Sequence, residues 1–204
     1  MLSKGFYADE PEKQQELLTL IREECQRLLK SVIRILDYSK MEARKIEYQI
    51  VQLNLPDIIR KSILKLAPLA RKKKILLEFS PPRTDLPMVC ADEDRLIEVL
   101  DNLVGNALKF TPPKGKVLIS CRLAEEGNGL LVCVEDTGPG IKPEHLENIF
   151  YKFKQIDNDL NAKMGTGLGL SISKYIIKAH GGKIWAQNQA SRGAKILFTL
   201  PAAS

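Results

Sequence analysis

Three glycines at alternate positions, Gly165, Gly167 and Gly169, run directly into an apolar helical pattern. Glycine lets backbone N–H groups turn toward a ligand with no Cβ in the way, and a helix N-terminus adds unpaired donors and partial positive charge. This combination suits a phosphate group. A flexible glycine hinge has the same composition, so the loop taken alone does not separate the two interpretations.

Two amides and a lysine form a second group of candidates. Asn102 and Asn106 are four residues apart on a predicted helix and Lys109 follows one turn later, so all three share one face. An asparagine oxygen is a hard ligand of the kind that magnesium accepts, and a nearby lysine can contact phosphate. Polar caps near a helix end are the simpler explanation of the same residues.

A third candidate is a carboxylate at the end of a predicted strand. Asp136 follows an apolar run and precedes Gly138 and Gly140. A carboxylate placed there can accept a hydrogen bond from an exocyclic amine, while the glycines let a flat base come close. An ordinary Asp-Thr-Gly turn is the alternative.

Two aromatic residues border the segment that leads to the glycine loop. Phe150 and Phe153 are predicted to anchor it in the core. The segment itself, residues 154–164, has few apolar side chains and adjoins two of the loop glycines. It has the composition of a lid.

The elements that must position these residues divide the chain in two. From residue 10 to about residue 39 apolar residues recur every three or four positions, in a stripe wide enough to need partners on more than one side, as in a four-helix bundle. Alternating residues at 45–55 then predict a strand. We therefore expect a segment of residues 1–44 and a domain of residues 45–204.

The second domain is predicted to mix helices with short strands. Helices are expected after Pro56, after the N-cap residue Asp92, from Pro143 and from Leu168. The expected strands are 75–79, 88–90, 116–121, 130–134, 183–187 and 195–200, and the apolar face of the helix after Pro56 is predicted to be Ile58, Ile59, Ile63, Leu64 and Leu66. Since β-α-β units do not repeat, the fold class is α/β (α+β): a two-layer sandwich of one mixed sheet with helices on one face.

Composition narrows the functional classes. The 44% hydrophobic and 27% charged content is that of a soluble protein, and no apolar run approaches the roughly 18 residues of a membrane span. The net charge of +6 and the basic run at 71–74 leave nucleic-acid binding as a weak alternative, because no aromatic residues are interleaved with the run. The cysteines lack paired spacing and are predicted to be buried thiols of a reducing compartment: Cys25, Cys90, Cys121 and Cys133.

Four segments in a fixed order carry a resemblance to a known family. Residues 102–109, 136–140, 149–153 and 165–170 read NLVGNALK, DTGPG, IFYKF and GTGLGL. They resemble the N, G1, F and G2 boxes of the catalytic domain of sensor histidine kinases, in the GHKL superfamily, and the similarity extends from about residue 37 to the C-terminus. Residues 10–44 resemble the second helix of that family's dimerisation and phosphoacceptor hairpin.

The resemblance implies the Bergerat-type ATP-binding fold and a site for Mg-ATP. Asn106 would coordinate the magnesium that bridges the phosphates, supported by Asn102 and Lys109. Asp136 would accept a hydrogen bond from the adenine amine, and Phe110, where tyrosine is common, would pack on the nucleotide. The remaining implied contacts are Gly138, Gly140 and Ile141 at the base, Lys152 and Lys154 as substitute phosphate contacts, and Gly165, Thr166, Gly167, Leu168 and Gly169 at the triphosphate.

Two departures bear on the reaction. Related ATPases such as gyrase carry a glutamate that activates water where this chain has Asn102. Because an amide cannot take that proton, phosphoryl transfer is favoured over hydrolysis. The chain has only two histidines, His145 and His180, and both are interpreted as surface or capping residues. Neither matches the family's phosphoacceptor, so we expect no autophosphorylation within this chain.

The sequence thus predicts a protein-histidine kinase catalytic domain of a two-component system. Its expected partners are ATP, a histidine-containing dimerisation hairpin, a response regulator receiver domain and a second copy through residues 10–39. We expect no nucleic acid, no membrane contact within this chain and a cytoplasmic location. A non-catalytic nucleotide-gated regulatory module is the main alternative, and a serine kinase of the anti-sigma type is a more distant one.

Overall fold

The computed structural model describes residues 11–43, 46–125, 129–152, 154, 167–190 and 192–203. The chain divides into two compact units, Met1–Ile46 and Glu47–Ser204. Each unit is described by itself.

The first unit consists, in its described part, of the helix α1 (Pro11–Glu42). Its apolar stripe faces solvent, because the large hydrophobic side chains along it are between 38% and 67% exposed. These exposed side chains are Leu18, Leu20, Ile21, Leu28, Leu29, Val32, Ile33, Ile35 and Leu36. No helix in the described part of the chain is long and apolar enough to cross a membrane.

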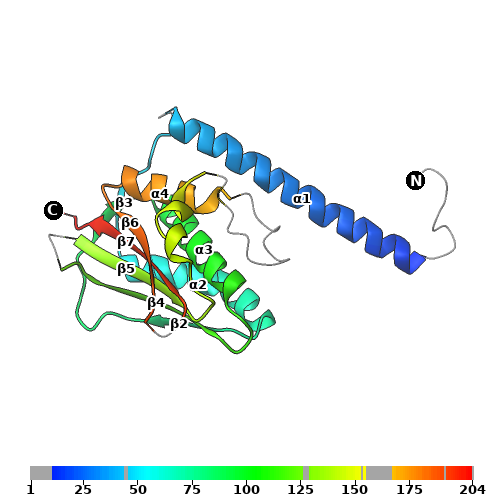
Figure 1. Ribbon diagram of the computed structural model, residues 1–204. Helices are drawn as coiled ribbons and strands as arrows, with labels where there is room; N and C mark the ends of the chain where they lie inside the picture. The colour runs from blue at the N-terminus through cyan, green and yellow to red at the C-terminus, as the bar shows by residue number, and fades with distance from the viewer. Residues whose placement is uncertain are drawn as a thin grey trace. The chain divides into compact units, whose positions relative to one another are not determined.

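The second unit is a mixed sheet with helices on one side (Figure 1). This arrangement confirms the predicted fold class. The sheet has the order β2-β4-β5-β7-β6, with only β2 and β4 parallel. Its strands are β2 (Leu76–Ser80), β4 (Lys116–Leu123), β5 (Gly129–Asp136), β6 (Ile184–Asn188) and β7 (Ala194–Pro201). The helices are α2 (Leu55–Lys72), α3 (Glu93–Phe110) and α4 (Gly169–Ala179), with single 3₁₀ turns η2 (Pro143–His145) and η3 (Asn148–Phe150).

The core lies between the sheet and the helices, and strand register sets its membership. Val117, Ile119 and Cys121 of β4 alternate with less buried residues, and their cross-strand partners on β5 include Val132 and Val134. Successive side chains of a strand point to opposite faces, so these residues form one apolar face under the helices. The same register brings Asp136 opposite Val117 at one end of that face.

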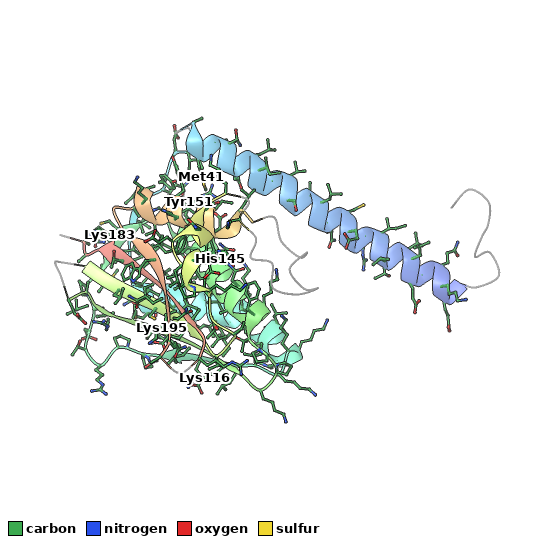
Figure 2. The ribbon with its side chains drawn as sticks, viewed as in Figure 1. Met41, Lys116, His145, Tyr151, Lys183 and Lys195 are labelled. Atoms are coloured by element: carbon green, nitrogen blue, oxygen red, sulfur yellow. The ribbon has the colours of Figure 1, made fainter. Side chains whose placement is uncertain are left out.

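The opposite face of the sheet is more polar and carries cross-strand ion pairs. Lys195 of β7 contacts Glu135 of β5 at 3.1 Å, and Lys116 of β4 contacts Glu78 of β2 at 2.7 Å. Figure 2 labels both lysines on their strands. Pairs of this kind contribute little free energy in water, but they mark the solvent side of the sheet.

The predicted strand at 45–55 is wrong in length. Only β1 (Val51–Leu53) is a strand, and it pairs antiparallel with the equally short β3 (Val89–Ala91). The partner strand ends because Asp92 caps α3, so the ladder cannot continue past Val51. The Asp92 carboxylate accepts the Gln49 N–H at 2.9 Å instead.

The predicted apolar face of α2 is wrong at Leu64, which is 74% exposed. The buried face runs through Ile58, Ile59 and Ser62, and the Ser62 hydroxyl donates to the Asp101 carboxylate on α3 at 2.8 Å. A polar residue occupies the helix interface because its hydroxyl has a partner there. Apolar periodicity could not indicate this.

The cysteines divide into two classes, which corrects the prediction of four buried thiols. Cys25 on α1 and Cys90 on β3 are exposed, whereas Cys121 and Cys133 are buried in the sheet. Burial raises the pKa of Cys121 to about 11 and that of Cys133 to about 12, the latter with a further contribution from Glu135. A thiol reacts as its thiolate, so the sheet cysteines should be inert.

We therefore predict that a thiol-alkylating reagent applied to the native chain near neutral pH labels Cys25 and Cys90 first. Cys121 and Cys133 should react at least about 100-fold more slowly, because their thiolate fraction and access are both reduced. Time-resolved peptide mass spectrometry measures the four rates. Labelling in urea provides the control, since all four rates should then converge.

Candidate nucleotide site

Helix α3 carries the candidate residues Asn102, Asn106 and Lys109. Its first turn is capped by the side chain of Asp92. The Asp92 carboxylate accepts the Arg95 N–H at 3.1 Å, which satisfies an otherwise unpaired donor at the helix start. Asn102, Asn106 and Lys109 are each half-buried along the helix. No described residue hydrogen-bonds the Asn106 side chain, which leaves its amide oxygen available to a ligand.

The Asn102 side chain instead contacts α4. Its Nδ2 donates to the Ser173 hydroxyl at 2.9 Å. A Cβ built on Gly169 would lie 2.2 Å from the Asn102 Oδ1, so any side chain at the first residue of α4 would collide with the amide. Gly169 is therefore required by the close approach of α4 to α3.

Asp136 lies at the carboxyl end of β5 with one carboxylate oxygen engaged and one available. Its Oδ1 accepts the Gly138 N–H at 2.8 Å and the Ala194 N–H at 3.4 Å. No described residue hydrogen-bonds its Oδ2. Burial raises the pKa of the carboxyl, and the two backbone N–H groups oppose the rise. Asp136 is thus a desolvated acceptor, which suits it to a neutral donor such as an amine.

The turn after Asp136 is shaped by close packing and by a second turn. A Cβ on Gly138 would lie 2.7 Å from the Asp136 Oδ1 and 3.0 Å from the Phe110 carbonyl oxygen, so only glycine fits there. Ile141 is held by Asn188, whose amide accepts the Ile141 N–H at 2.8 Å and donates to the Ile141 carbonyl at 2.6 Å.

Sequence reasoning missed the part played by the β6–β7 turn. Gln189 Nε2 donates to the Asp136 carbonyl at 2.7 Å, and Gly193 packs so closely that a Cβ would lie 1.8 Å from the same oxygen. Together with Asn188 these residues support the turn after β5 from a segment some fifty residues away. The adjacent amides after an apolar strand were the only sequence signal.

Lys109 and Phe110 end α3 on the same side as Asp136 and Gly138. The Lys109 Nζ lies 5.1 Å from the centre of the Phe110 ring, and the ring is 48% exposed. Burial lowers the pKa of Lys109, and the positive charge of Lys73 lowers it further. An anion bound beside Lys109 would oppose both effects.

The glycine loop is described only at its end. Gly167 has a φ of +68° and Gly140, across the site, has a φ of +81°. Leu168 is buried and precedes α4 as a cap residue with no side-chain hydrogen bond to the helix. The predicted triphosphate contacts Gly165 and Thr166 lie outside the described residues.

The predicted aromatic anchor is confirmed at one of its two residues. Phe150 is 5% exposed, which confirms it as a core residue, whereas Phe153 lies outside the described residues. The Lys174 Nζ on α4 lies 5.8 Å from the Phe150 ring centre and 5.7 Å from that of Tyr151, which Figure 2 labels beside α4. Lys152 and Lys154 are exposed. The rest of the predicted lid, residues 155–164, lies outside the described residues.

His180 uses both of its ring nitrogens for contacts within the fold. His180 is buried at the end of α4, where its Nε2 accepts the Asp92 N–H at 3.1 Å and its Nδ1 lies 2.8 Å from the Ile176 carbonyl oxygen. Both ring nitrogens are therefore occupied, which confirms the capping interpretation. His145 lies in η2, half-buried (Figure 2).

The chain is similar to known proteins both in sequence and in fold. Residues 91–204 match the family model described as histidine kinase-, DNA gyrase B- and HSP90-like ATPase. The chain is 35% identical to the sensor histidine kinase WalK of Bacillus subtilis over 187 residues, covering 90% of this chain and 30% of that protein. The chain thus spans less than a third of the length of that relative.

Two solved structures share the fold over nearly the whole chain. Full-length ShkA in complex with AMPPNP has a TM-score of 0.83 at 32% identity, covering 94% of this chain and 39% of that one. Histidine kinase ThkA in complex with the response regulator protein TrrA has a TM-score of 0.75 at 30% identity, covering 99% of this chain and 55% of that one.

The chain therefore belongs to the histidine kinase-, DNA gyrase B- and HSP90-like ATPase family. Within that family its relatives are sensor histidine kinases. The chain carries the ATP-binding catalytic domain of a sensor histidine kinase.

We predict that Asp136→Asn weakens ATP binding but keeps the hydrogen bonds that residue 136 accepts within the protein. The amide oxygen can still accept from Gly138 and Ala194, but the other atom becomes a donor that faces the adenine amine. ATP binding measured by calorimetry should weaken by about 10- to 100-fold, as expected for loss of a charge-assisted hydrogen bond. Equal binding by both proteins would contradict the adenine assignment.

The same variant has an expected pH signature. Because the folded pKa of Asp136 lies above its ordinary value of 3.8, the stability contributed by this group is fully present at acidic pH and is lost as pH rises through the folded pKa. Asp136→Asn removes that loss. In urea titrations, the unfolding free energy of the variant relative to that of the wild type should rise as the pH increases from the ordinary pKa of 3.8 through the folded pKa.

Proposed function

We propose that this domain binds Mg-ATP and transfers the γ-phosphoryl group to a histidine on a separate helix. The observation that carries the proposal is the placement of Asp136. A desolvated carboxylate with one oxygen held by backbone N–H groups and the other free of described partners suits the edge of adenine. The exposed side chain of Phe110, whose carbonyl oxygen lies near Gly138, would suit the face of the base. The solved relative ShkA was captured with AMPPNP, an ATP analogue, which supports the same ligand here.

The phosphates would lie between the end of α3 and the start of α4. Asn106 is the proposed protein ligand of Mg²⁺, whose role when bound is to bridge and neutralise phosphate oxygens. Lys109 would contact a phosphate oxygen, whose negative charge would oppose the lowering of the lysine pKa. Gly165, Thr166, Gly167, Leu168 and Gly169 remain proposed contacts of the triphosphate.

The amide at Asn102 favours transfer over hydrolysis. It cannot accept a proton from water, so this position supplies no general base. Its hydrogen bond to Ser173 also holds it against α4, where it can orient the phosphate end of the site. Catalysis would then rest on positioning and charge neutralisation, as phosphoryl transfer requires.

We further propose that residues 1–44 are part of a dimerisation hairpin and that residues 45–204 are the catalytic domain. The exposed apolar stripe of α1 supports a role in helix packing. A response regulator receiver domain is the proposed recipient of the phosphoryl group from the histidine. ThkA, a relative with the same fold, was solved with such a regulator.

We predict phosphoryl transfer in trans. Incubation of this chain with Mg-ATP labelled at the γ-position and a separate histidine-containing acceptor hairpin should label the hairpin, and the chain itself should stay unlabelled. Acid lability of the label identifies phosphohistidine. Asn106→Ala should reduce the rate by at least about 100-fold, because charge stabilisation of the transferring group is lost.

Two controls make this result decisive. A hairpin with its histidine replaced by alanine should remain unlabelled, and Asp57→Ala, an exposed residue on α2 away from the site, should transfer at the wild-type rate. Binding of ATP without any transfer to several acceptor hairpins would favour the regulatory module instead. Label on a serine would favour the anti-sigma type of kinase.

We also predict that α1 drives weak self-association. Its stripe leaves apolar side chains in water that a second copy would cover. Sedimentation equilibrium should show a concentration-dependent dimer that Leu28→Glu with Ile35→Glu abolishes. A strict monomer at high concentration would contradict the proposed dimer.

A further inference from the structure

Two residues of α4 contact the same side chain on α3. Gly169 and Ser173 are four residues apart and therefore lie on one face of the helix. Both meet Asn102: Gly169 lies against its Oδ1, and the Ser173 hydroxyl accepts from its Nδ2 at 2.9 Å. The amide is thus held at both ends by the helix that begins where the glycine loop ends.

The burial of Ser173 fixes which atom of the Asn102 amide faces it. Ser173 is 1% exposed, so its hydroxyl cannot be replaced by water without opening the helix interface. Because the Asn102 Nδ2 is tied to Ser173, the oxygen is the atom held next to the start of α4. An amide freed from this bond could rotate and present its donor in place of its acceptor.

We propose that Ser173 is a positioning residue for phosphoryl transfer, acting by fixing the orientation of the Asn102 amide. The inference rests on the proposed function and adds a residue outside the glycine loop to it. Ser173 touches neither base nor phosphate in this assignment. It sets the geometry of the phosphate end through Asn102, while Asp136 and Phe110 hold the base end independently.

The position of the contact predicts which kinetic constant changes. Ser173→Ala should leave ATP affinity within about twofold, because the base contacts remain, and lower the rate of transfer at saturating ATP about tenfold, the effect of one misplaced hydrogen bond. Calorimetry with AMPPNP measures the affinity, and single-turnover labelling of a separate acceptor hairpin measures the rate.

Ser62→Ala is a matched control. Ser62 is also 1% exposed, and its hydroxyl also bonds a side chain of α3, Asp101, at 2.8 Å, but on the side that packs on α2. Both variants should lower the melting temperature by a similar amount, and only Ser173→Ala should slow transfer. Equal rates for the two variants would overturn the proposal.

A double-mutant cycle tests whether Ser173 acts through Asn102. In an Asn102→Ala background, Ser173→Ala should cause no further loss of rate, because the amide that it positions is gone. An additive tenfold loss would show that Ser173 acts by another route and would overturn the assignment.

Nuclear magnetic resonance separates this inference from the function on which it rests. The Asn102 side-chain amide signals, assigned by their absence in Asn102→Asp, should shift in Ser173→Ala and stay in place in Ser62→Ala. Unshifted signals would contradict the hydrogen bond whatever the activity. A wild-type chain that binds AMPPNP but labels no acceptor would contradict the transfer function, and with it the positioning role.

Discussion

The close approach of α4 to α3 is the constraint on which the site depends. At the start of α4, a Cβ on residue 169 would fall 2.2 Å from the side-chain oxygen of Asn102 on α3, so the amide would have to move. This proximity brings the end of the glycine loop to the face of α3 that carries the asparagines. The contact is secured at the other end of the helices, where His180 of α4 accepts a hydrogen bond from the backbone of Asp92, the cap of α3. One helix pair therefore places the two phosphate candidates together.

The part of the proposed site that would hold the adenine base is formed by strand ends and turns, not by a helix pair. Asp136 stands where β5 leaves the sheet, and the β6–β7 turn supports it from the other side through Gln189 and Asn188. These turns fix a carboxylate in a desolvated position at a cost in stability, as the raised pKa indicates. The turn after Asp136 comes close to Phe110, the last residue of α3, through Gly138.

The two ends bear on the proposal that the chain transfers phosphate and does not hydrolyse ATP. The position that would hold a water-activating carboxylate in related ATPases holds an amide whose hydrogen-bonding group is already used by Ser173. In the proposed site, Asn102 would orient a phosphoryl group and would itself supply no base to water. His180 is engaged through both ring nitrogens, so the proposed transfer would use an acceptor other than this residue.

The sequence by itself determined the fold class, most element positions and the identity of the candidate residues, because helical periodicity, caps such as Asp92 and the glycine-rich turns are local properties of the chain. It could not determine the short β1 or the exposure of Leu64 and Cys90, since these depend on partners distant in sequence. Nor could it indicate Asn188, Gln189 or Ser173, whose polar groups acquire a role only from what faces them. Tertiary structure decided those points because hydrogen bonding and burial are set by contacts between segments, not by spacing along one of them.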